Sequence, residues 1–425
     1  MGNLKAIIVS IITAFQLIVS SIFPSTQKLP DVSSKTNLDL PKQALQQGTR
    51  KIIELSKNVD LKKLSASLPG VQIISLGDGR YIVIGGSGSS ADLQDQLSKL
   101  KNIRKIDTPK HVKIINPIQK SAPVQAIAPQ TDKTVNDTYY KYEWYIGATA
   151  SNKAWSLIKQ QREITVAVLD TGIDYSHPDL KNRILTNLGY NFLTGTKDAT
   201  DDNGHGTHVS GIIAAQANNN QGITGVTGSL DVKIIPIKVL DSNGEGDTDI
   251  IAKGIRYAAD AGADIINMSF GAAEKDVDID NAIKYAQSKG VFMVAAAGND
   301  GKDAALYSPA GNEGVFTVAA VNENLKRASF SNYGSVVQVA SPGVSILSTI
   351  PGGKYQAWDG TSMAAPIVSG IAAILKAENP SLTPDQISSL LDSTAEVSSG
   401  TQKNVSTGYG VVNAYDAVKK LEGIK

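Results

Sequence analysis

The sequence predicts an α/β fold in which a mostly parallel central sheet carries helices on both faces, preceded by a small α+β unit. Four apolar runs have the composition of strands that are buried on both faces. They are residues 164–170, 232–240, 263–270 and 291–298. Two helical segments, 247–263 and 278–290, alternate with them. This alternation is typical of parallel strands joined by crossover helices, and such sheets form their sites at the carboxyl ends of the strands.

The composition of the 425-residue chain is that of a globular protein, with 41% hydrophobic and 19% charged residues. A chain of this length buries a large core, and we expect it to contain more than one domain. It has no cysteine, which excludes disulfides, cysteine-ligated zinc and a thiol nucleophile. Its stability must therefore come from packing or from bound ions.

The net charge of +1 hides an asymmetry along the chain. Residues 1–130 carry 17 Lys and Arg against 8 Asp and Glu, and residues 131–425 carry 24 against 32, which gives charges of +9 and −8. Either the two parts attract each other, or the asymmetry reflects chance and a basic linker. No cluster of Lys and Arg indicates nucleic acid, so we expect no nucleic-acid partner.

The N-terminal segment, residues 1–25, has the pattern of a secretory signal peptide. Lys5 precedes an apolar run from Ala6 to Phe23, and polar residues dilute that run. The alternative is an uncleaved membrane anchor, because the run is near the length needed to span a bilayer. We expect a signal peptide, and hence a secreted, extracellular protein.

Residues 50–115 predict a small α/β unit. Residues 71–76 and 80–85 have strand composition and flank a Gly-Asp-Gly turn, and residues 89–100 form an amphipathic helix with a serine cap. Residues 116–134 contain three prolines and few large side chains, which predicts a linker.

Four separate segments place reactive side chains at strand ends or helix starts. Asp170 ends the first apolar strand, and Asn299 follows the last one. His205 opens a helix between two glycines that permit close backbone approach, and Ser362 lies in the first turn of a buried helix, 360–375. Each has an ordinary explanation as a turn residue, a packed histidine or a helix cap. Together they supply the nucleophile, base, base-orienting acid and oxyanion donor of acyl transfer.

Two alternatives compete with that interpretation. His205 and His208 lie three residues apart and would share a helix face, as in a metalloenzyme, but the sequence has no HExxH-type glutamate and no clear third ligand. The second alternative is a non-catalytic binding protein with the same fold. The presence of Asp170, His205, Asn299 and Ser362 together argues against it. We predict that His205 is the base and that His208 packs beneath it as a neutral, hydrogen-bonded histidine.

The segments VAVLDTGID, NGHGTHVSG, AAAGND and GTSMAAPIVSG resemble, in order and wording, the four signature segments of the subtilisin-like serine proteases, or subtilases. The resemblance covers roughly residues 135–425. It implies a subtilisin-like fold and a serine endopeptidase in which Ser362 attacks the scissile carbonyl and His205 takes its proton. Asp170 would orient His205, and Asn299 with the Ser362 backbone N–H would bind the oxyanion. Broad specificity is expected, and a dedicated processing protease with a narrow substrate range is the alternative.

The resemblance also implies a domain order. Residues 26–125 would comprise a ferredoxin-like pro-domain and its linker, and residues 126–425 the peptidase domain. The pro-domain of this family inhibits the enzyme and assists its folding, so we expect a self-processing zymogen whose junction lies within 116–136. The mature enzyme is expected to be a monomer that acts on protein and peptide substrates.

The substrate-binding edges of the family match two further segments. Backbone pairing with substrate on both sides is implied, together with one wall of the S1 pocket. The matching residues are Ser269, Phe270, Gly271, Gly244, Gly246, Ala297 and Gly298. Glu245 and Asp247 near this cleft would either favour basic substrate residues or be solvated loop charges.

A structural calcium ion is the expected cofactor. Residues 177–180 and 217–226 resemble the family's strong calcium site, and calcium prefers oxygen ligands. The implied ligands are the side chains of Asp137, Asp179 and Asn219 and the carbonyls of Ala217, Gln221 and Ile223. The alternative is a plain polar loop. A second, weaker site in the acidic stretch 195–204 is also considered.

Overall fold

The computed structural model describes residues 49–57, 59–85, 89–115, 118–119, 134–159, 162–396 and 403–424. The chain divides into two units, Met1–Asn37 and Leu38–Lys425, and all described residues lie in the second. The expected signal peptide and its membrane-anchor alternative fall outside the described residues. Within the described part, no helix has both the length and the apolar character needed to cross a membrane.

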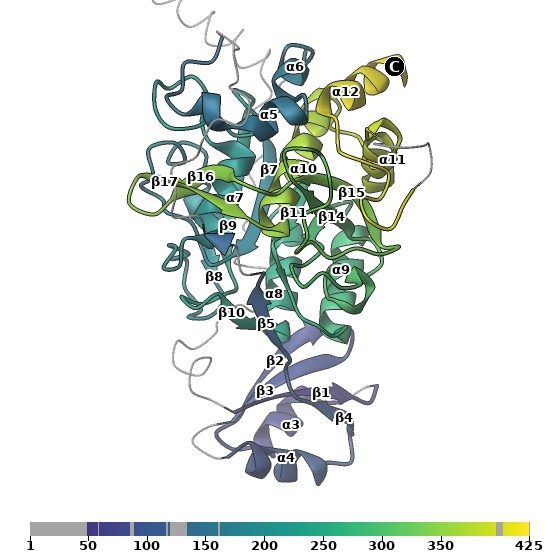
Figure 1. Cartoon of the computed structure of the whole chain (residues 1–425). Coiled ribbons are helices and arrows are strands. Elements are labelled where there is room, and N and C mark those ends of the chain that lie inside the picture. The colour runs from purple at the N-terminus through teal and green to yellow at the C-terminus, as the bar shows by residue number, and fades with distance from the viewer. Residues whose placement is uncertain are drawn as a thin grey trace, which may run out of the picture. The chain divides into compact units, whose positions relative to one another are not determined.

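A seven-stranded sheet forms the centre of residues 162–424, and every pairing in it is parallel (Figure 1). Its strands lie in the order β15-β14-β13-β11-β7-β9-β8. They are β7 (Ile164–Asp170), β8 (Tyr190–Asn191), β9 (Val232–Lys238), β11 (Ile265–Met268), β13 (Phe292–Ala296), β14 (Phe316–Val321) and β15 (Val337–Pro342). All seven residues of β7 are buried, which confirms the strand predicted from its apolar run.

Helices cover both faces of this sheet. They are α7 (His205–Ala214), α8 (Thr248–Asp260), α9 (Val277–Ser288) and α10 (Thr361–Glu378). On β7, Val166 and Val168 share a core cluster with α7 and α10, whereas Leu169 faces Gly254 of α8. Because side chains alternate along a strand, α7 and α10 lie on one face and α8 on the other. The predicted α/β architecture is therefore confirmed.

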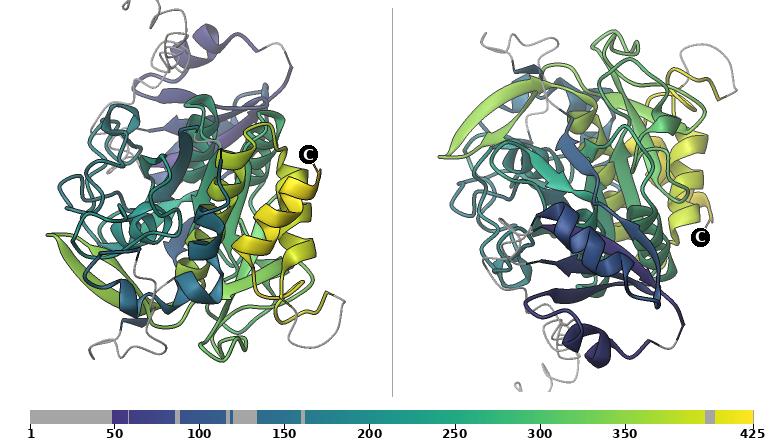
Figure 2. Two further views of the ribbon diagram at one scale, coloured as in Figure 1. Left: turned by 90° about the horizontal axis from the view of Figure 1, so that it is seen from above. Right: turned by 90° about the horizontal axis from the view of Figure 1, so that it is seen from below.

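Shorter helices surround these elements. α5 (Trp144–Ala148) and α6 (Ser151–Trp155) precede the sheet, and α11 (Pro384–Thr394) and α12 (Ala414–Ile424) follow α10. α12 packs against α11, and Figure 2 shows these two yellow helices side by side.

Residues 50–107 form a separate four-stranded antiparallel sheet in the order β2-β3-β1-β4. Its elements are β1 (Arg50–Leu55), α3 (Leu61–Ala66), β2 (Gln72–Gly77), β3 (Arg80–Ile84), α4 (Ser90–Ser98) and β4 (Ile103–Asp107). The element order β-α-β-β-α-β with this strand order is the ferredoxin-like topology expected from the sequence. We call residues 49–107 the front unit. Ser89 caps α4 as predicted: its hydroxyl accepts from the Asp92 backbone N–H, and the Asp92 carboxylate accepts from the Ser89 backbone N–H.

Two small sheets contain the chain that follows the front unit. β5 (His111–Ile114) lies between β10 (Glu245–Asp247) and β12 (Phe270–Gly271) and is antiparallel to both. β6 (Ile118–Gln119) pairs with the hairpin of β16 (Ile346–Ile350) and β17 (Lys354–Asp359). Of the predicted linker 116–134, only residues 118–119 and 134 are described. The sequence did not predict β5, β6 or β14–β17.

Candidate active site

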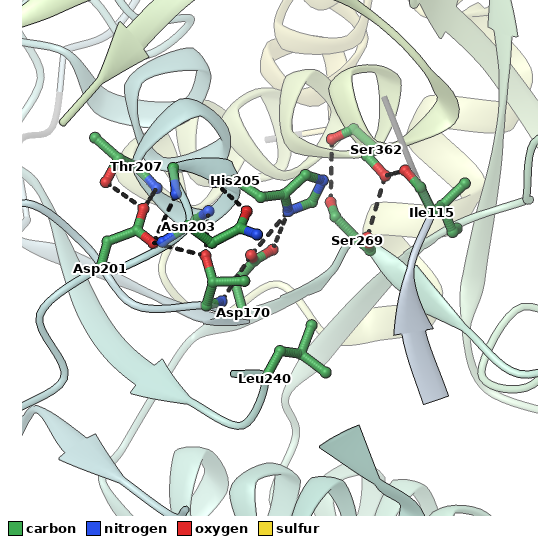
Figure 3. A network of polar contacts seen from close by, with 12 residues as sticks. Ile115, Asp170, Asp201, Asn203, His205, Thr207, Leu240, Ser269 and Ser362 are labelled. Carbon is green, nitrogen blue, oxygen red and sulfur yellow. Dashed lines mark hydrogen bonds and ion pairs between the residues drawn. The ribbon is translucent and has the colours of Figure 1, made fainter. Parts of the chain in front are cut away.

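Asp170 and His205 meet at the carboxyl end of β7 (Figure 3). The Nδ1 atom of His205 lies 2.8 Å from Asp170 Oδ1 and 2.9 Å from Oδ2, and both side chains are fully buried. The backbone N–H of Thr171 also donates to Asp170 Oδ1 at 2.8 Å. The carboxylate therefore holds the imidazole with Nδ1 protonated and directs Nε2 away from β7.

Asp201 fixes the start of α7. Its carboxylate accepts backbone N–H bonds from Asn203, Gly204 and Thr207 at 2.9–3.0 Å (Figure 3). A Cβ atom on Gly206 would lie 2.1 Å from the carbonyl oxygen of Gly172, the residue two after Asp170. Glycine at 206 is thus required because the first turn of α7 packs directly on the loop after β7.

Ser362 lies at the start of α10 and faces His205 across the site (Figure 3). Its Oγ lies 3.1 Å from the carbonyl oxygen of Ser269 and 3.2 Å from that of Ile115, either of which accepts its proton. His205 Nε2 is buried and has no hydrogen-bond partner among the described residues.

Asn299 follows β13, and its amide is held by the residue before Ser362. The backbone N–H and the hydroxyl of Thr361 donate to Asn299 Oδ1 at 3.0 and 2.9 Å. These two bonds fix the orientation of the amide, so Nδ2 points away from Thr361. Sequence reasoning missed this role of Thr361, although its position next to the serine was a usable signal.

His208 is engaged separately from His205. It stacks flat on Trp358, with ring centroids 4.3 Å apart and an interplanar angle of 2°, and its Nε2–H donates to the Gln356 carbonyl at 3.0 Å. Burial lowers the pKa of His208 to about 3, as expected for an imidazole that packs in the core without a carboxylate partner. The bond to Gln356 is the hydrogen bond expected for this histidine. The two imidazoles do not converge on one point.

The predicted substrate-binding edges enclose the chain's own strand β5. Lys113 is paired with Glu245 on one side and Gly271 on the other, and Ile114 is paired with Phe270. Further contacts involve Gly244, whose carbonyl accepts from Ile114 N at 2.7 Å, and Gly246, which is paired with Val112. Four predicted edge residues thus line one extended segment, and Ser269 instead contacts Ser362.

The side chains of β5 alternate between the two sides of this slot. Val112 and Ile114 are buried, whereas His111 and Lys113 are exposed and form ion-pair contacts with the rim carboxylates. Lys113 contacts Glu245, and His111 lies 3.3 Å from both Glu245 Oε2 and Asp247 Oδ1. The carboxylates of Glu245 and Asp247 therefore have basic partners on β5.

The two residues of the predicted S1 wall, Ala297 and Gly298, are buried within the protein. Ala297 packs into a small cluster with Ala304, Tyr307 and Ala310. Gly298 has φ +112°, and a Cβ atom there would lie 2.2 Å from Asn332 Nδ2. Glycine at 298 is required by this conformation and this close approach. A contact of Ala297 or Gly298 with a substrate side chain stays a prediction.

Asp137 and Asp179 belong to a second polar cluster around the loop 217–224. Asp179 is fully buried and accepts bonds from Asn219 Nδ2 at 2.8 Å and from the backbone of Ile223 at 2.9 Å. Asp137 accepts from the backbone of Asn219 at 3.0 Å. The structure thus brings four of the six predicted ligand residues together. Gln221 approaches through its N–H, which donates to Asn219 Oδ1 at 2.8 Å, and Ala217 is buried nearby in the same loop.

Glu143 adds a third carboxyl that the sequence analysis missed. It is fully buried and accepts bonds from Thr224 N at 2.8 Å and Tyr145 OH at 2.7 Å. Burial raises the pKa of Glu143 well above its usual value, and the charges of Asp137 and Asp179 raise it further. Among the described residues, no Lys or Arg forms an ion pair with these three carboxyls.

The cluster fits a hard cation in its chemistry. Two buried carboxylates and an amide are ligands that calcium prefers, and they lack a balancing positive charge. Asn219 would have to turn its amide over to present oxygen. In the acidic stretch 195–204, two carboxylates have other partners. Asp201 accepts backbone N–H bonds at the start of α7, and Asp202 pairs with Lys238 at 2.7 Å. No group of three or more His, Asp or Glu suited to a metal occurs in the described residues.

Comparison with known proteins agrees with this geometry. The model of the subtilase family matches residues 161–412. A thermophilic serine proteinase of Bacillus sp. (strain AK1) is 43% identical over 286 residues, which are 67% of this chain and 69% of the relative. Thermitase of Thermoactinomyces vulgaris is 39% identical over 287 residues, which are 67% of this chain and 99% of thermitase.

Solved structures extend the similarity. Fervidolysin from Fervidobacterium pennivorans, a keratinolytic enzyme related to subtilisin, matches with a TM-score of 0.74 and 29% identity over 88% of this chain and 61% of its own. A protease from Pseudoalteromonas arctica PAMC 21717 matches with a TM-score of 0.62 and 35% identity over 68% of this chain and 99% of its own. With a matching family model and relatives of this identity, the chain belongs to the subtilase family and is a serine-type endopeptidase.

Proposed function

We propose that this peptidase works through Asp170, His205 and Ser362, with Asn299 as an oxyanion donor. The observation that carries the proposal is the asymmetric engagement of His205. Its Nδ1 bonds to both Asp170 oxygens at 2.8 and 2.9 Å, while its buried Nε2 has no hydrogen-bond partner in the part of the chain that the structure describes. A base that is held on one nitrogen and free on the other is ready to accept the serine proton.

The reaction follows from these positions. Ser362 Oγ attacks the scissile carbonyl carbon as its proton passes to His205 Nε2, and Asp170 stabilises the resulting imidazolium. The carbonyl oxygen becomes an anion at the N-terminus of α10, where the Ser362 N–H and Asn299 Nδ2 donate to it. Thr361 supports this role because it ties down the amide oxygen of Asn299.

Substrate would bind as an extended strand between β10 and β12. Pairing through backbone atoms on both sides places few demands on side chains, which supports broad specificity over a dedicated processing role. The burial of alternate residues in β5 supports a preference for apolar side chains at alternate positions. Ala297 and Gly298 are the proposed S1 wall.

The front unit would act as an intramolecular inhibitor, so the chain would be a zymogen. Its support is twofold: β5 occupies the proposed substrate slot, and ion pairs join the front unit to α8 and α9. Arg50 lies 3.1 Å from Asp249, Arg80 2.5 Å from Asp278, and Arg256 2.6 Å from Asp78. Two of these three pairs join a basic residue of the front unit to an acidic residue of the peptidase part, which favours electrostatic attraction over chance for the charge asymmetry.

Secretion, a monomeric mature enzyme and structural calcium complete the proposal. The signal-peptide pattern of residues 1–25 supports export. Calcium is a common structural ion of subtilases, and the uncompensated carboxylates of Asp137 and Asp179 support a site there, with Asn219 and the carbonyls of Ala217, Gln221 and Ile223.

The decisive experiment is Ser362→Ala. We expect an unprocessed chain without caseinolytic activity, measured by gel mobility and casein hydrolysis. On the wild type, a serine-directed sulfonyl or phosphonyl reagent should abolish activity, whereas phenanthroline should leave it intact. A Ser362→Ala product that is processed and active would overturn the mechanism.

A further inference from the structure

We propose that the chain makes its first self-cleavage at the carbonyl of Ile115, so that the N-terminal product ends in Ile115. The proposal rests on the peptidase function proposed above, and it identifies the peptide bond after Ile115 as the first bond that this activity cleaves. It differs from the expected junction within the linker 116–136, because the attacked carbonyl lies immediately before that linker.

The first support is the position of the carbonyl itself. The Ile115 carbonyl oxygen lies 3.2 Å from Ser362 Oγ (Figure 3). Among the described residues, the other acceptor of this hydroxyl is the Ser269 carbonyl at 3.1 Å. Ser269 is buried beside α10, and its own hydroxyl bonds back to the Ser362 carbonyl at 3.1 Å, so it belongs to the wall of the site. Ile115 is the residue that arrives from the inserted strand.

The second support is the register of the chain on both sides of Ile115. Before it, Lys113 and Ile114 pair with Gly271 and Phe270, and antiparallel continuation brings Ile115 opposite Ser269. After it, the backbone of residues 118 and 119 pairs with Asp359 and Trp358, just before the start of α10. The chain is therefore held by strand pairing on both sides of the carbonyl that faces Ser362. This is the arrangement of a bound substrate and not of a spacer passing over the site.

The third support is the chemistry of the Ile115 side chain. It is half-buried against the main apolar core, and its Cδ1 lies 3.8 Å from the point where a Cβ of Gly271 would be. An aliphatic side chain is stabilised there, whereas a carboxylate would lose hydration without gaining a partner. The nearest basic side chain of the strand, Lys113, points outward to Glu245.

The bond changes balance with the groups present and one water molecule. Ser362 Oγ bonds to the Ile115 carbonyl carbon while its proton passes to His205 Nε2. The peptide C–N bond to the next residue then breaks, and His205 returns the proton to the leaving nitrogen. Water next attacks the acyl ester with His205 again as base, which releases the Ile115 carboxylate and restores the serine hydroxyl.

The test follows the first cut of the full-length chain. Freshly refolded protein is quenched at short intervals, and both fragments are identified by intact mass and N-terminal sequencing. We expect the earliest pair to be a fragment that ends in Ile115 and a fragment that begins with Asn116. Later trimming of the new N-terminus would generate shorter products only after this pair.

Two variants at one position sharpen the test. Ile115→Asp should slow the first cut roughly 100-fold, because a charge enters an apolar site, whereas Ile115→Leu should process at a rate close to the wild type. Circular dichroism of both variants in a Ser362→Ala background checks their folding. As a measurement independent of folding, active mature enzyme should cut a synthetic peptide of residues 108–120 after the isoleucine at position 115.

The outcomes separate the two proposals. A first cut elsewhere in an active wild type, an Ile115→Asp variant that processes at the wild-type rate, or a peptide cut at another bond overturns the assignment and leaves the peptidase mechanism standing. A wild type that neither processes nor hydrolyses casein overturns the proposed function itself.

Discussion

Two clusters of buried carboxyls differ in how their charge is balanced. Asp170 is fully buried and has one histidine whose Nδ1 meets both of its oxygens. Asp179 is equally buried, but its bonds come from an amide, a tyrosine hydroxyl and a backbone N–H, and two more acids, Asp137 and Glu143, lie close to it. The first cluster contains a group that becomes cationic when His205 is protonated, whereas no Lys or Arg among the described residues forms an ion pair with the second. Burial alone therefore does not reveal what a carboxylate does: its partners do.

The largest expected effect is on the cluster of Asp170 and His205. Asp170→Asn keeps the shape of the side chain but removes the charge that stabilises the imidazolium, so kcat/KM for a peptide substrate should fall by roughly 100- to 10,000-fold. The unfolding midpoint should change little, because the amide still contacts Nδ1. Activity within tenfold of the wild type would show that Asp170 is not the partner of the base.

Calcium removal should act instead on the cluster of Asp137, Glu143 and Asp179. At free calcium one hundred times the dissociation constant, binding to the native state adds about 2.7 kcal/mol of stability. Chelation with EDTA should remove that contribution and lower the unfolding midpoint, and Asp179→Asn should abolish the difference. Asp231→Asn, at an exposed carboxylate paired with Lys233, is the matched control. An EDTA-independent midpoint, with no heat in a calcium titration of Ser362→Ala, would favour the plain polar loop.

The pH dependence of stability should report on Glu143. Its pKa is raised in the folded state by burial, so the native protein holds a proton that the unfolded chain releases above its usual pKa of 4.5. Stability from this group is complete below that pKa and is lost as pH rises towards the raised value. In calcium-free buffer, Glu143→Gln should flatten this decline in the unfolding free energy, measured by urea titration. An unchanged slope would mean that Glu143 is ionised in the native protein.

The smallest effect is expected at Glu245, a partly exposed carboxylate. Glu245 contacts Lys113, and the side chains are about one-third and one-half exposed. Peptides with lysine two residues before the cleaved residue should be preferred over those with glutamine by no more than about fivefold, since ion pairs in contact with solvent contribute little. Glu245→Gln or high salt should remove this preference. A preference that survives both would assign it to another residue.

The central strands and helix starts were predictable because a strand that is buried on both faces appears in the sequence as a continuous run of apolar residues. The run ITVAVLD is buried at every position, and α7 begins at the predicted His205. β16 and β17 were not predicted, because each mixes polar and apolar residues and forms a strand only by pairing with the other. The same holds for β5, whose pattern of alternate burial depends on two partners more than a hundred residues away.

The candidate site divides in the same way. Asp170, His205, Asn299 and Ser362 were identified from residue types at strand ends and helix starts. Thr361 was missed although it directly precedes Ser362 in the sequence. Glu143 was missed because only the folded chain brings its carboxyl near Asp137 and Asp179. The two histidines of NGHGTHVSG were separated correctly, and Trp358 and Gln356 supply the contacts that hold His208 apart.

The sequence by itself determined the parallel sheet and predicted the reactive groups, because hydrophobic periodicity and side-chain chemistry are properties of neighbouring residues. Only the tertiary structure decided what lies between β10 and β12, and so which carbonyl faces Ser362. The physical reason is that a strand edge offers the same N–H and C=O groups to any extended segment. Which segment pairs with it depends on where the rest of the chain is anchored, here by the front unit and its ion pairs to α8 and α9.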